Sequence, residues 1–198
     1  MHLRAPAILI SARPHGETAV IARLLTQDHG VLAAYVAGGR GRQLRPVCIP
    51  GNLVEAEIRA RSDSQLPFAR LELVQSRGPW LTEPLPASAI TWTCALAASV
   101  LPERNAYPRL YHALAALLNA ICNAPSARGW APALAAYEVL LLRELGYGGT
   151  RPEIASLEEA LKFLRASEGP IERYLLADTR VDVLAARTLL MQRLERMA

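Results

Sequence analysis

The hydrophobic pattern changes its period part-way along the chain, and this change constrains the fold more than any other feature of the sequence. Residues 52–61 alternate between apolar and charged side chains, which places Val54, Ala56 and Ile58 on one face. A period of two residues is typical of a strand with one buried face. After the proline-rich stretch at 77–86, apolar residues recur at helical spacing instead. We therefore expect a β part followed by a helical part.

The β part is predicted to contain five short strands separated by turns that are rich in glycine and proline. The strands cover residues 7–11, 18–26, 31–37, 52–61 and 68–76. This pattern is typical of a small barrel or sandwich, and a five-stranded, partly open barrel of this size is an OB-fold. OB-folds often bind single-stranded nucleic acid. We predict an OB-fold domain over residues 1–78.

The remaining residues, 79–198, are predicted to form an all-α domain, so that the fold class is α+β. The helices cover residues 88–101, 107–124, 132–149, 157–166 and 182–197. Gly146 is the expected C-terminal cap of the third helix, and Ser156 with Glu159 forms a capping box before the fourth. The aromatic side chains of this domain are expected in its core, namely Trp92, Tyr107, Tyr111, Trp130 and Tyr137.

Composition excludes several classes of protein. The chain is 52% hydrophobic and 20% charged, so it is expected to bury a core and not to be disordered. No apolar stretch approaches the roughly 18 residues of a membrane helix, and Arg13 interrupts the N-terminal apolar run too early for a signal peptide. We expect a cytoplasmic, nucleoid-associated protein. Cys48, Cys94 and Cys122 are too far apart for zinc-ligand spacing and are expected to be small buried side chains.

Basic charge is concentrated in one part of the chain. The whole net charge of +4 lies in the first 80 residues, which hold ten arginines against six acidic residues. Such asymmetry suggests that this part faces a polyanion, although a chance imbalance remains the alternative.

The sequence GGRGRQLRP, residues 38–46, is the strongest candidate binding site. It places Arg40, Arg42 and Arg45 among three glycines, with no acidic residue between them. Arginine presents a planar fork that suits phosphate, and glycine allows a close approach of the backbone. If the flanking strands are neighbours in the barrel, the loop projects from it and its arginines are placed to contact phosphate. A plain solvated loop is the alternative.

Further DNA-binding candidates lie on the strands. Arg59 and Arg61 share one face of their strand and could extend the basic surface, with Arg13 as a weaker candidate. Glu55 and Glu57 lie on the same face and limit its positive charge, so we rank the loop above the strand. Tyr35 is either a base-stacking residue or a core tyrosine.

Catalytic motifs are lacking in the sequence. The four histidines (His2, His15, His29 and His112) form no HExxH motif, and there is no P-loop, dinucleotide fingerprint or nucleophile elbow. This favours a binding protein over an enzyme, and no cofactor is expected.

Three stretches carry motifs that together are specific. Residues 12–42 contain Gly16-Glu17, Thr26 to Gly30 and Gly38 to Arg42; residues 50–52 form a PGN turn; and residues 136–148 contain Tyr137-Glu138 and Leu145 to Gly148. In this order and spacing they resemble the RecO family of bacterial recombinational DNA-repair proteins. The resemblance implies an OB-fold, binding of single- and double-stranded DNA, and annealing of complementary strands. It also implies partnership with RecR and with the C-terminal tail of the single-strand-binding protein, to help load RecA.

The chain departs from the family pattern in its second half. Many relatives carry a cysteine cluster after the L-G-Y-G motif, whereas no cysteine follows Cys122 here, so we predict a shortened C-terminal part without zinc. Ala135 and Ala136 stand where relatives can carry basic residues. An acidic, apolar-ended tail needs an apolar groove with arginine at its rim. The candidate partner-binding residues are Arg109, Arg128 and Arg143. The alternative function is an OB-fold protein-interaction scaffold without DNA binding.

Overall fold

The computed structural model describes residues 2–60, 62, 65–148, 153–179 and 183–197. The chain divides into two compact units, and each is considered by itself. The barrel unit comprises Met1–Thr82 and Leu101–Tyr111, and the helical unit comprises Glu83–Val100 and His112–Ala198.

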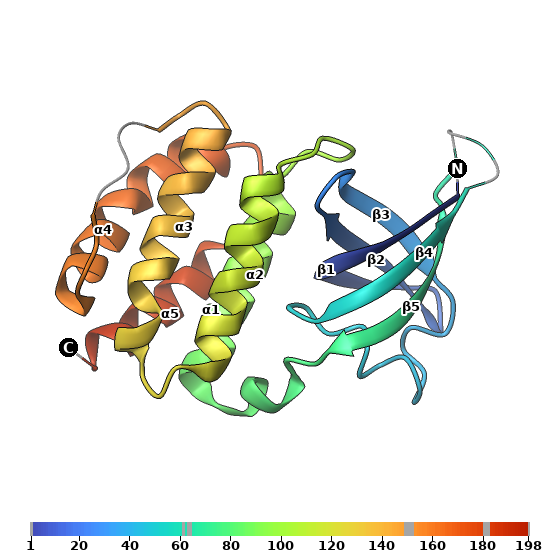
Figure 1. The fold of residues 1–198 in the computed structure, drawn as a ribbon, viewed down its shortest axis with the longest axis horizontal. Coiled ribbons are helices and arrows are strands. Elements are labelled where there is room, and N and C mark those ends of the chain that lie inside the picture. The colour runs from blue at the N-terminus through green and yellow to red at the C-terminus, as the bar shows by residue number, and fades with distance from the viewer. Residues whose placement is uncertain (1, 61, 63–64, 149–152, 180–182, 198) are drawn as a thin grey trace. The chain divides into compact units, whose positions relative to one another are not determined.

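The described residues of the barrel unit form five strands, as the sequence predicts (Figure 1). They are β1 (His2–His15), β2 (Ala19–Thr26), β3 (Gly30–Val36), β4 (Leu53–Arg59) and β5 (Phe68–Gln75). The sheet closes in the order β1-β2-β3-β5-β4, with β1 paired to both β2 and β4. Only Tyr35 and Phe68 pair between the parallel strands β3 and β5. This closed, five-stranded barrel is an OB-fold.

The first strand is longer than predicted. It covers His2–His15 instead of residues 7–11 because its first half pairs with β4 while its second half pairs with β2. The register shifts between Leu9 and Ser11, which is a β-bulge that bends the strand where it passes from one partner to the other. Only the central part of β1 is a continuous apolar run. The two ends of the strand carry polar residues, so the sequence pattern does not indicate them.

The core of the barrel comes from the alternating pattern that the sequence shows. Val54, Ala56 and Ile58 on β4 are all 0% exposed, as the alternation predicts. Residues at every second position of β2 and β3 join them in one apolar cluster. Of the intervening positions, Ile21 and Tyr35 are half-buried on the outer face, whereas Leu25 and Val31 are 0% exposed.

A segment from beyond the first helix also belongs to the barrel unit. Residues 101–111 run beside the start of β3, where the backbone N–H of Arg104 donates to the carbonyl of Val31 at 2.9 Å. Arg23 on β2 forms an ion pair of 2.7 Å with Glu103. The predicted domains, residues 1–78 and 79–198, stay a prediction; the segment lies in the second of them by sequence and in the barrel unit by its contacts.

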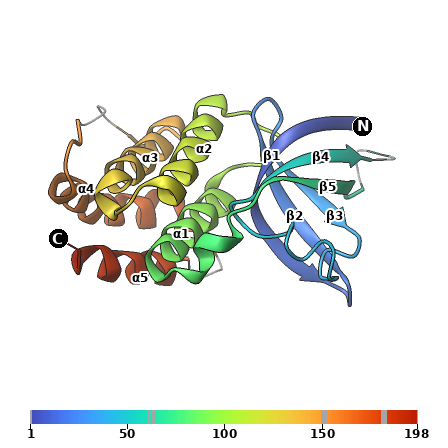
Figure 2. The same cartoon turned by 60° about the horizontal axis from the view of Figure 1, so that its bottom comes forward.

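Within the described residues after the barrel strands, the chain forms five α-helices, in agreement with the prediction. They are α1 (Pro84–Val100), α2 (Pro108–Asn123), α3 (Ala131–Glu144), α4 (Leu157–Pro170) and α5 (Leu184–Glu195), with short turns η1 (Gly78–Thr82), η2 (Ala127–Gly129) and η3 (Ile171–Leu175). Helix α1 begins at Pro84, before the predicted start at residue 88, because proline is tolerated in the first turn, where its N–H would have no partner. In the helical unit α3 packs against α4 and α1 against α5 (Figure 2).

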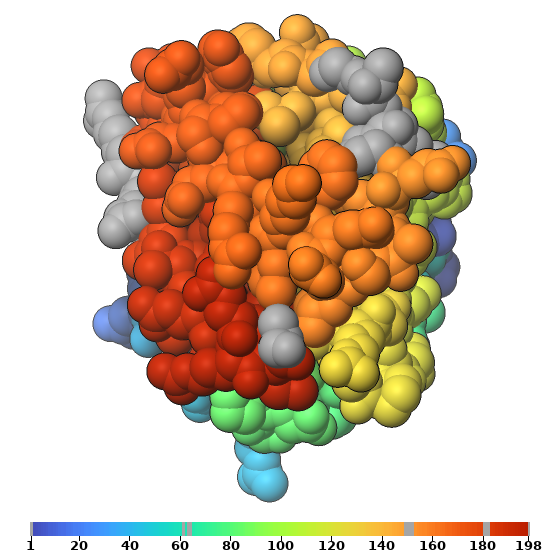
Figure 3. All heavy atoms as spheres, turned by 90° about the vertical axis from the view of Figure 1, so that its left-hand side faces the viewer, coloured from blue at the N-terminus to red at the C-terminus, as the bar shows by residue number. Residues whose placement is uncertain are grey.

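The predicted helix caps are confirmed. Gly146 has a φ of 92°, and the N–H groups of Gly146 and Tyr147 donate to the carbonyls of Arg143 and Leu142 at the end of α3. The Ser156 hydroxyl accepts from the backbone N–H of Glu159, while the Glu159 carboxylate accepts from that of Ser156. In Figure 3 α4 (orange) and α5 (red) lie side by side on one face of the helical unit.

The predicted core aromatics are buried, with one partial exception. Trp92, Trp130 and Tyr137 are at most 2% exposed, Tyr111 is 9% exposed and Tyr107 is half-buried. Of the cysteines, Cys94 and Cys122 are buried, whereas Cys48 is half-buried, and burial raises the pKa of its thiol. None of the described helices is long and apolar enough to cross a bilayer.

Candidate nucleic-acid interface

The basic loop, residues 38–46, leaves β3 through tight backbone turns. Gly38 has a φ of 68°, in the left-handed region that glycine adopts without a Cβ clash. A Cβ on the buried Gly39 would lie 2.6 Å from a side-chain carbon of Val20. The backbone N–H of Gly41 donates to the carbonyl of Gly38 at 2.8 Å. Gly38 and Gly39 are therefore required for the fold of the loop itself.

Arg40 holds the basic loop against the turn between β1 and β2. Its Nη1 donates to the carbonyls of Gly16 at 3.2 Å and Glu17 at 3.0 Å, and its backbone N–H donates to the carbonyl of Thr18 at 2.8 Å. Because the guanidinium is already engaged with two carbonyls, its first role is to fix the loop. Its contact with phosphate stays a prediction.

Arg42 and Arg45 differ from Arg40 in their surroundings. Both side chains are exposed, and neither forms a hydrogen bond or ion pair with any residue that the structure describes. No acidic side chain among the described residues offsets their charge by direct contact. These two arginines therefore carry the positive charge of the loop that a ligand can reach.

Asn52 fixes the other end of the loop from inside the barrel unit. Its side chain is 0% exposed, and Nδ2 donates to the carbonyls of Pro46 at 2.9 Å and Val47 at 3.0 Å. Its Oδ1 accepts from the backbone N–H of Arg77 at 2.7 Å. One side chain thus provides hydrogen-bond partners for three backbone groups. This stabilises the fold, because a buried polar group without a partner costs free energy. Asn52 is the residue that gives the PGN motif its structural role.

Strand register places three predicted DNA-binding residues in one row around the outside of the barrel. Successive partners across β1, β2, β3, β5 and β4 are Arg13, Ile21, Tyr35, Phe68 and Arg59, which we call the outer row. These side chains face outward because the neighbouring Ala22, Ala34 and Ile58 face the core. The outer row has an arginine at each end and apolar residues between. Arg61, also predicted to bind DNA, lies outside the described residues.

Tyr35 lies on the outer face of the barrel, so the core alternative for this residue is wrong. The inward-facing positions of β3 are its even-numbered residues. The ring centroid of Tyr35 is 5.2 Å from that of Phe68 and 5.9 Å from that of His15, and both contacts are edge-to-face. Tyr35 is half-buried by these neighbours, whereas Phe68 remains 60% exposed. The stacking role of Tyr35 stays a prediction.

Tyr35, Phe68 and His15 form an aromatic group on the outer face of the barrel. The sequence analysis predicts a binding role for Tyr35 but not for Phe68 or His15. A single phenylalanine at the start of a strand is commonly a core residue. The outward direction of Phe68 can be inferred from the alternation along β5. Ala69 and Leu71 face the core, so Phe68, at the intervening position, faces outward.

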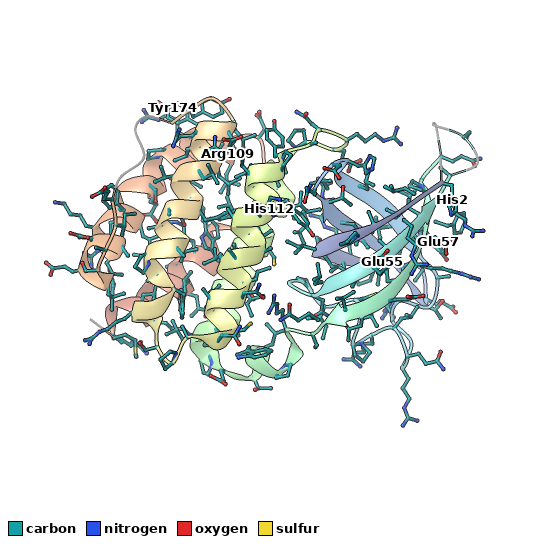
Figure 4. All side chains as sticks on the ribbon, viewed as in Figure 1. His2, Glu55, Glu57, Arg109, His112 and Tyr174 are labelled. Carbon is teal, nitrogen blue, oxygen red and sulfur yellow. The ribbon has the colours of Figure 1, made fainter. Side chains whose placement is uncertain are left out.

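The outer face of β4 carries ion pairs in place of free positive charge (Figure 4). Arg59 Nε donates to the carboxylate of Glu57 at 2.9 Å, and His2 Nε2 lies 3.1 Å from the same carboxylate. Glu55 pairs with Arg4 at 3.1 Å. The hydrogen bond from Arg59, and then that from His2, holds the pKa of the Glu57 carboxyl below its ordinary value. The charge of Arg59 is thus offset, which again favours the loop over the strand.

The three candidate partner-binding arginines have different surroundings. Arg109 is exposed in the first turn of α2 and falls within the barrel unit. Arg128 is exposed in η2 and, with residues 155–158, lines a hollow of about 440 Å³ at the start of α4. Arg143 is half-buried in the last turn of α3. Their role in binding a partner stays a prediction.

Glu138, from the aromatic–Glu motif, is the centre of a buried polar network in the helical unit. Its Oε1 accepts from Trp92 Nε1 at 2.8 Å, and its Oε2 accepts from Ser167 Oγ at 2.5 Å and Arg187 Nη2 at 3.1 Å. The side chains of Arg187 and Glu138 are 2% and 0% exposed. The guanidinium of Arg187 also lies 5.7 Å from the centre of the Trp92 ring. The network joins α1, α3, α4 and α5, and Glu138 is fully engaged within it.

Comparison with known proteins gives matches in both units. Two family models match, Recombination protein O N terminal over residues 1–77 and Recombination protein O C terminal over residues 83–149. The chain is 43% identical over 143 residues to a DNA repair protein RecO from Rhodospirillum centenum, covering 72% of this chain and 56% of that protein. It is 38% identical over 151 residues to one from Gluconacetobacter diazotrophicus, covering 75% and 59% of the two chains.

These alignments cover less than two thirds of the length of the relatives. The two family models cover the barrel strands, the basic loop and the L-G-Y-G motif on which the resemblance in the sequence rests. The closed OB-fold barrel and the helices that follow it agree with that resemblance. The chain belongs to the RecO family of DNA repair proteins.

Proposed function

We propose that the barrel unit binds single- and double-stranded DNA during recombinational repair, and that the protein anneals complementary strands. The observation that carries this proposal is the pair Arg42 and Arg45, exposed on a loop that Arg40 and Asn52 hold in place. Guanidinium groups can contact the phosphates of any strand without reading its bases. Backbone contacts of this kind suit annealing, since both strands must keep their bases available for pairing.

We also propose that the protein works with RecR and with the C-terminal tail of the single-strand-binding protein to help load RecA. The family supports this role, and the helical unit offers suitable chemistry. Arg128 stands beside a hollow of about 440 Å³, where a cationic side chain could pair with an acidic tail. The protein would act by binding, with no catalytic step and no cofactor.

The test is the binding of a labelled single strand, measured by fluorescence anisotropy across a salt series. The double variant Arg42→Ala, Arg45→Ala is expected to bind more weakly at low salt. The slope of log affinity against log salt should fall by about 1.4, since each phosphate contact on a single strand contributes about 0.7. The matched control is Arg173→Ala, Arg196→Ala, which removes two exposed arginines from the helical unit.

Three outcomes separate the explanations. A control variant that keeps the wild-type slope, beside a loop variant that loses it, supports a phosphate-binding loop. Equal losses in both variants would mean that only net charge matters. If the wild type binds no strand even at low salt, DNA binding is wrong and the protein-interaction scaffold takes its place.

Arg40→Ala is expected to weaken DNA binding without reducing the salt slope. Loss of its hydrogen bonds to Gly16 and Glu17 frees the loop, which must then be ordered on binding. We expect affinity to fall roughly 2- to 12-fold, the equivalent of one net hydrogen bond of about 0.5–1.5 kcal/mol. The same salt series measures both quantities. A slope reduced by about 0.7 would show instead that Arg40 contacts phosphate directly.

A further inference from the structure

We propose that Phe68, supported by Tyr35 and His15, forms a stacking platform for an unpaired base of single-stranded DNA. This inference rests on the proposed DNA binding and adds a second mode of contact to it. The basic loop would hold phosphates of either strand type, whereas the platform would hold a base and would therefore select single strands.

Phe68 is exposed to solvent and is held in place by its neighbours. Its side chain is 60% exposed, although it is a large apolar ring on a strand of a closed barrel. Tyr35 contacts it edge-to-face at 5.2 Å and is itself contacted edge-to-face by His15 at 5.9 Å. The backbone N–H of Tyr35 donates to the carbonyl of Pro67 at 2.7 Å, which fixes the start of β5 beside β3. The ring is thus exposed but held in place, so that little order is lost on binding.

The aromatic group and the basic loop both adjoin the turn between β1 and β2. His15 is the last residue of β1, and the turn that follows it provides the carbonyls of Gly16 and Glu17. Arg40 in the basic loop donates to both carbonyls. The basic loop, through Arg40, and the aromatic group, through His15, therefore adjoin the same turn of the barrel unit. This turn is one of the loops with which OB-folds bind oligonucleotides.

Charge identifies the occupant. The outer row has Arg13 at one end, exposed and without an ion-pair partner among the residues that the structure describes. Arg59 at the other end is offset by Glu57. Arg13 and the exposed ring of Phe68 lie in the same row, separated by Ile21 and Tyr35. A cation in the same row as an exposed apolar ring matches a nucleotide, which combines a negative phosphate with a flat base. In a duplex the bases are already stacked on one another, so an exposed ring is available only to an unpaired base.

The experiment compares three DNA probes of equal length by fluorescence anisotropy: oligothymidine, the same backbone with abasic sites throughout, and a duplex. Phe68→Ala should weaken oligothymidine binding about 5- to 150-fold, which corresponds to the roughly 1–3 kcal/mol of one base–aromatic contact. Binding of the abasic strand and the duplex should not change. Phe68→Trp should retain binding to oligothymidine, because tryptophan also offers a flat ring.

Val74→Ala is the matched control, since Val74 is an apolar residue on the same strand that is 58% exposed and lies outside the outer row. Its affinities should equal those of the wild type. If Phe68→Ala binds oligothymidine as the wild type does while Arg42→Ala, Arg45→Ala does not, the platform is wrong and the phosphate-binding loop stands. Equal weakening on the abasic strand would assign Phe68 a structural role and also overturn the platform. If the wild type binds no single-stranded DNA, both the proposed DNA binding and the stacking platform are wrong.

Discussion

Glu138→Ala is expected to lower the free energy of unfolding by about 3–5 kcal/mol, the usual result of removing one partner from a buried ion pair. The substitution removes the closer carboxylate partner of the Arg187 guanidinium, which is 2% exposed, and leaves it the longer ion pair of 3.6 Å to Glu168, whose side chain is 55% exposed. It also removes the acceptor of Trp92 Nε1 and of the Ser167 hydroxyl. Urea denaturation followed by far-ultraviolet circular dichroism measures the change, since the network joins four helices.

Two further variants identify the cause. The double change Glu138→Leu, Arg187→Met removes both charges together and should recover the part of the loss that comes from the unpaired charge, because apolar side chains of similar size can replace a buried pair. The part that comes from Trp92 Nε1 and the Ser167 hydroxyl should remain. Glu195→Ala breaks the pair with Arg165, whose side chains are 43% and 60% exposed, and should change stability by at most about 1 kcal/mol. A loss for Glu138→Ala no greater than that for Glu195→Ala would show that the buried network does not stabilise the helices.

The fold was predictable where local pattern determines it. Alternation in β4 and helical spacing after residue 86 each reflect burial of one face, which a short window of sequence shows. The ends of β1 were not predictable in this way, because His2 is in the strand only through its pairing with Arg59. Residues 101–111 join the barrel through contacts such as that between Arg104 and Val31, far apart in sequence.

The candidate site shows the same division between local and long-range information. The arginines of the basic loop are visible in the sequence, but the difference between them is not. Arg40 is engaged because the turn after His15 lies beside it, whereas Arg42 and Arg45 have no such neighbour among the described residues. The register between β3 and β5 brings Tyr35 and Phe68 together, and a single strand does not determine its own register with a partner.

Asn52→Ala is expected to lower the free energy of unfolding by at least about 2 kcal/mol, because each buried polar group left unpaired costs about 1–3 kcal/mol. The backbone N–H of Arg77 loses its acceptor, and the carbonyls of Pro46 and Val47 lose their donor. Denaturation by urea or heat measures the loss. The matched control is Asn123→Ala, since Asn123 also donates to a backbone carbonyl but is exposed, and its replacement should change stability by about 0.5 kcal/mol or less.

The same variant connects the interior of the barrel to DNA binding. Asn52 holds the chain that follows Arg45, so its loss should free the basic loop at the end opposite to Arg40. We therefore expect Asn52→Ala to bind oligothymidine more weakly at a temperature where it is fully folded, with a salt slope close to that of the wild type. Arg42 and Arg45 would still meet the phosphates, but only after the loop is ordered. An unchanged affinity, together with the expected loss of stability, would show that the loop keeps its binding conformation without Asn52.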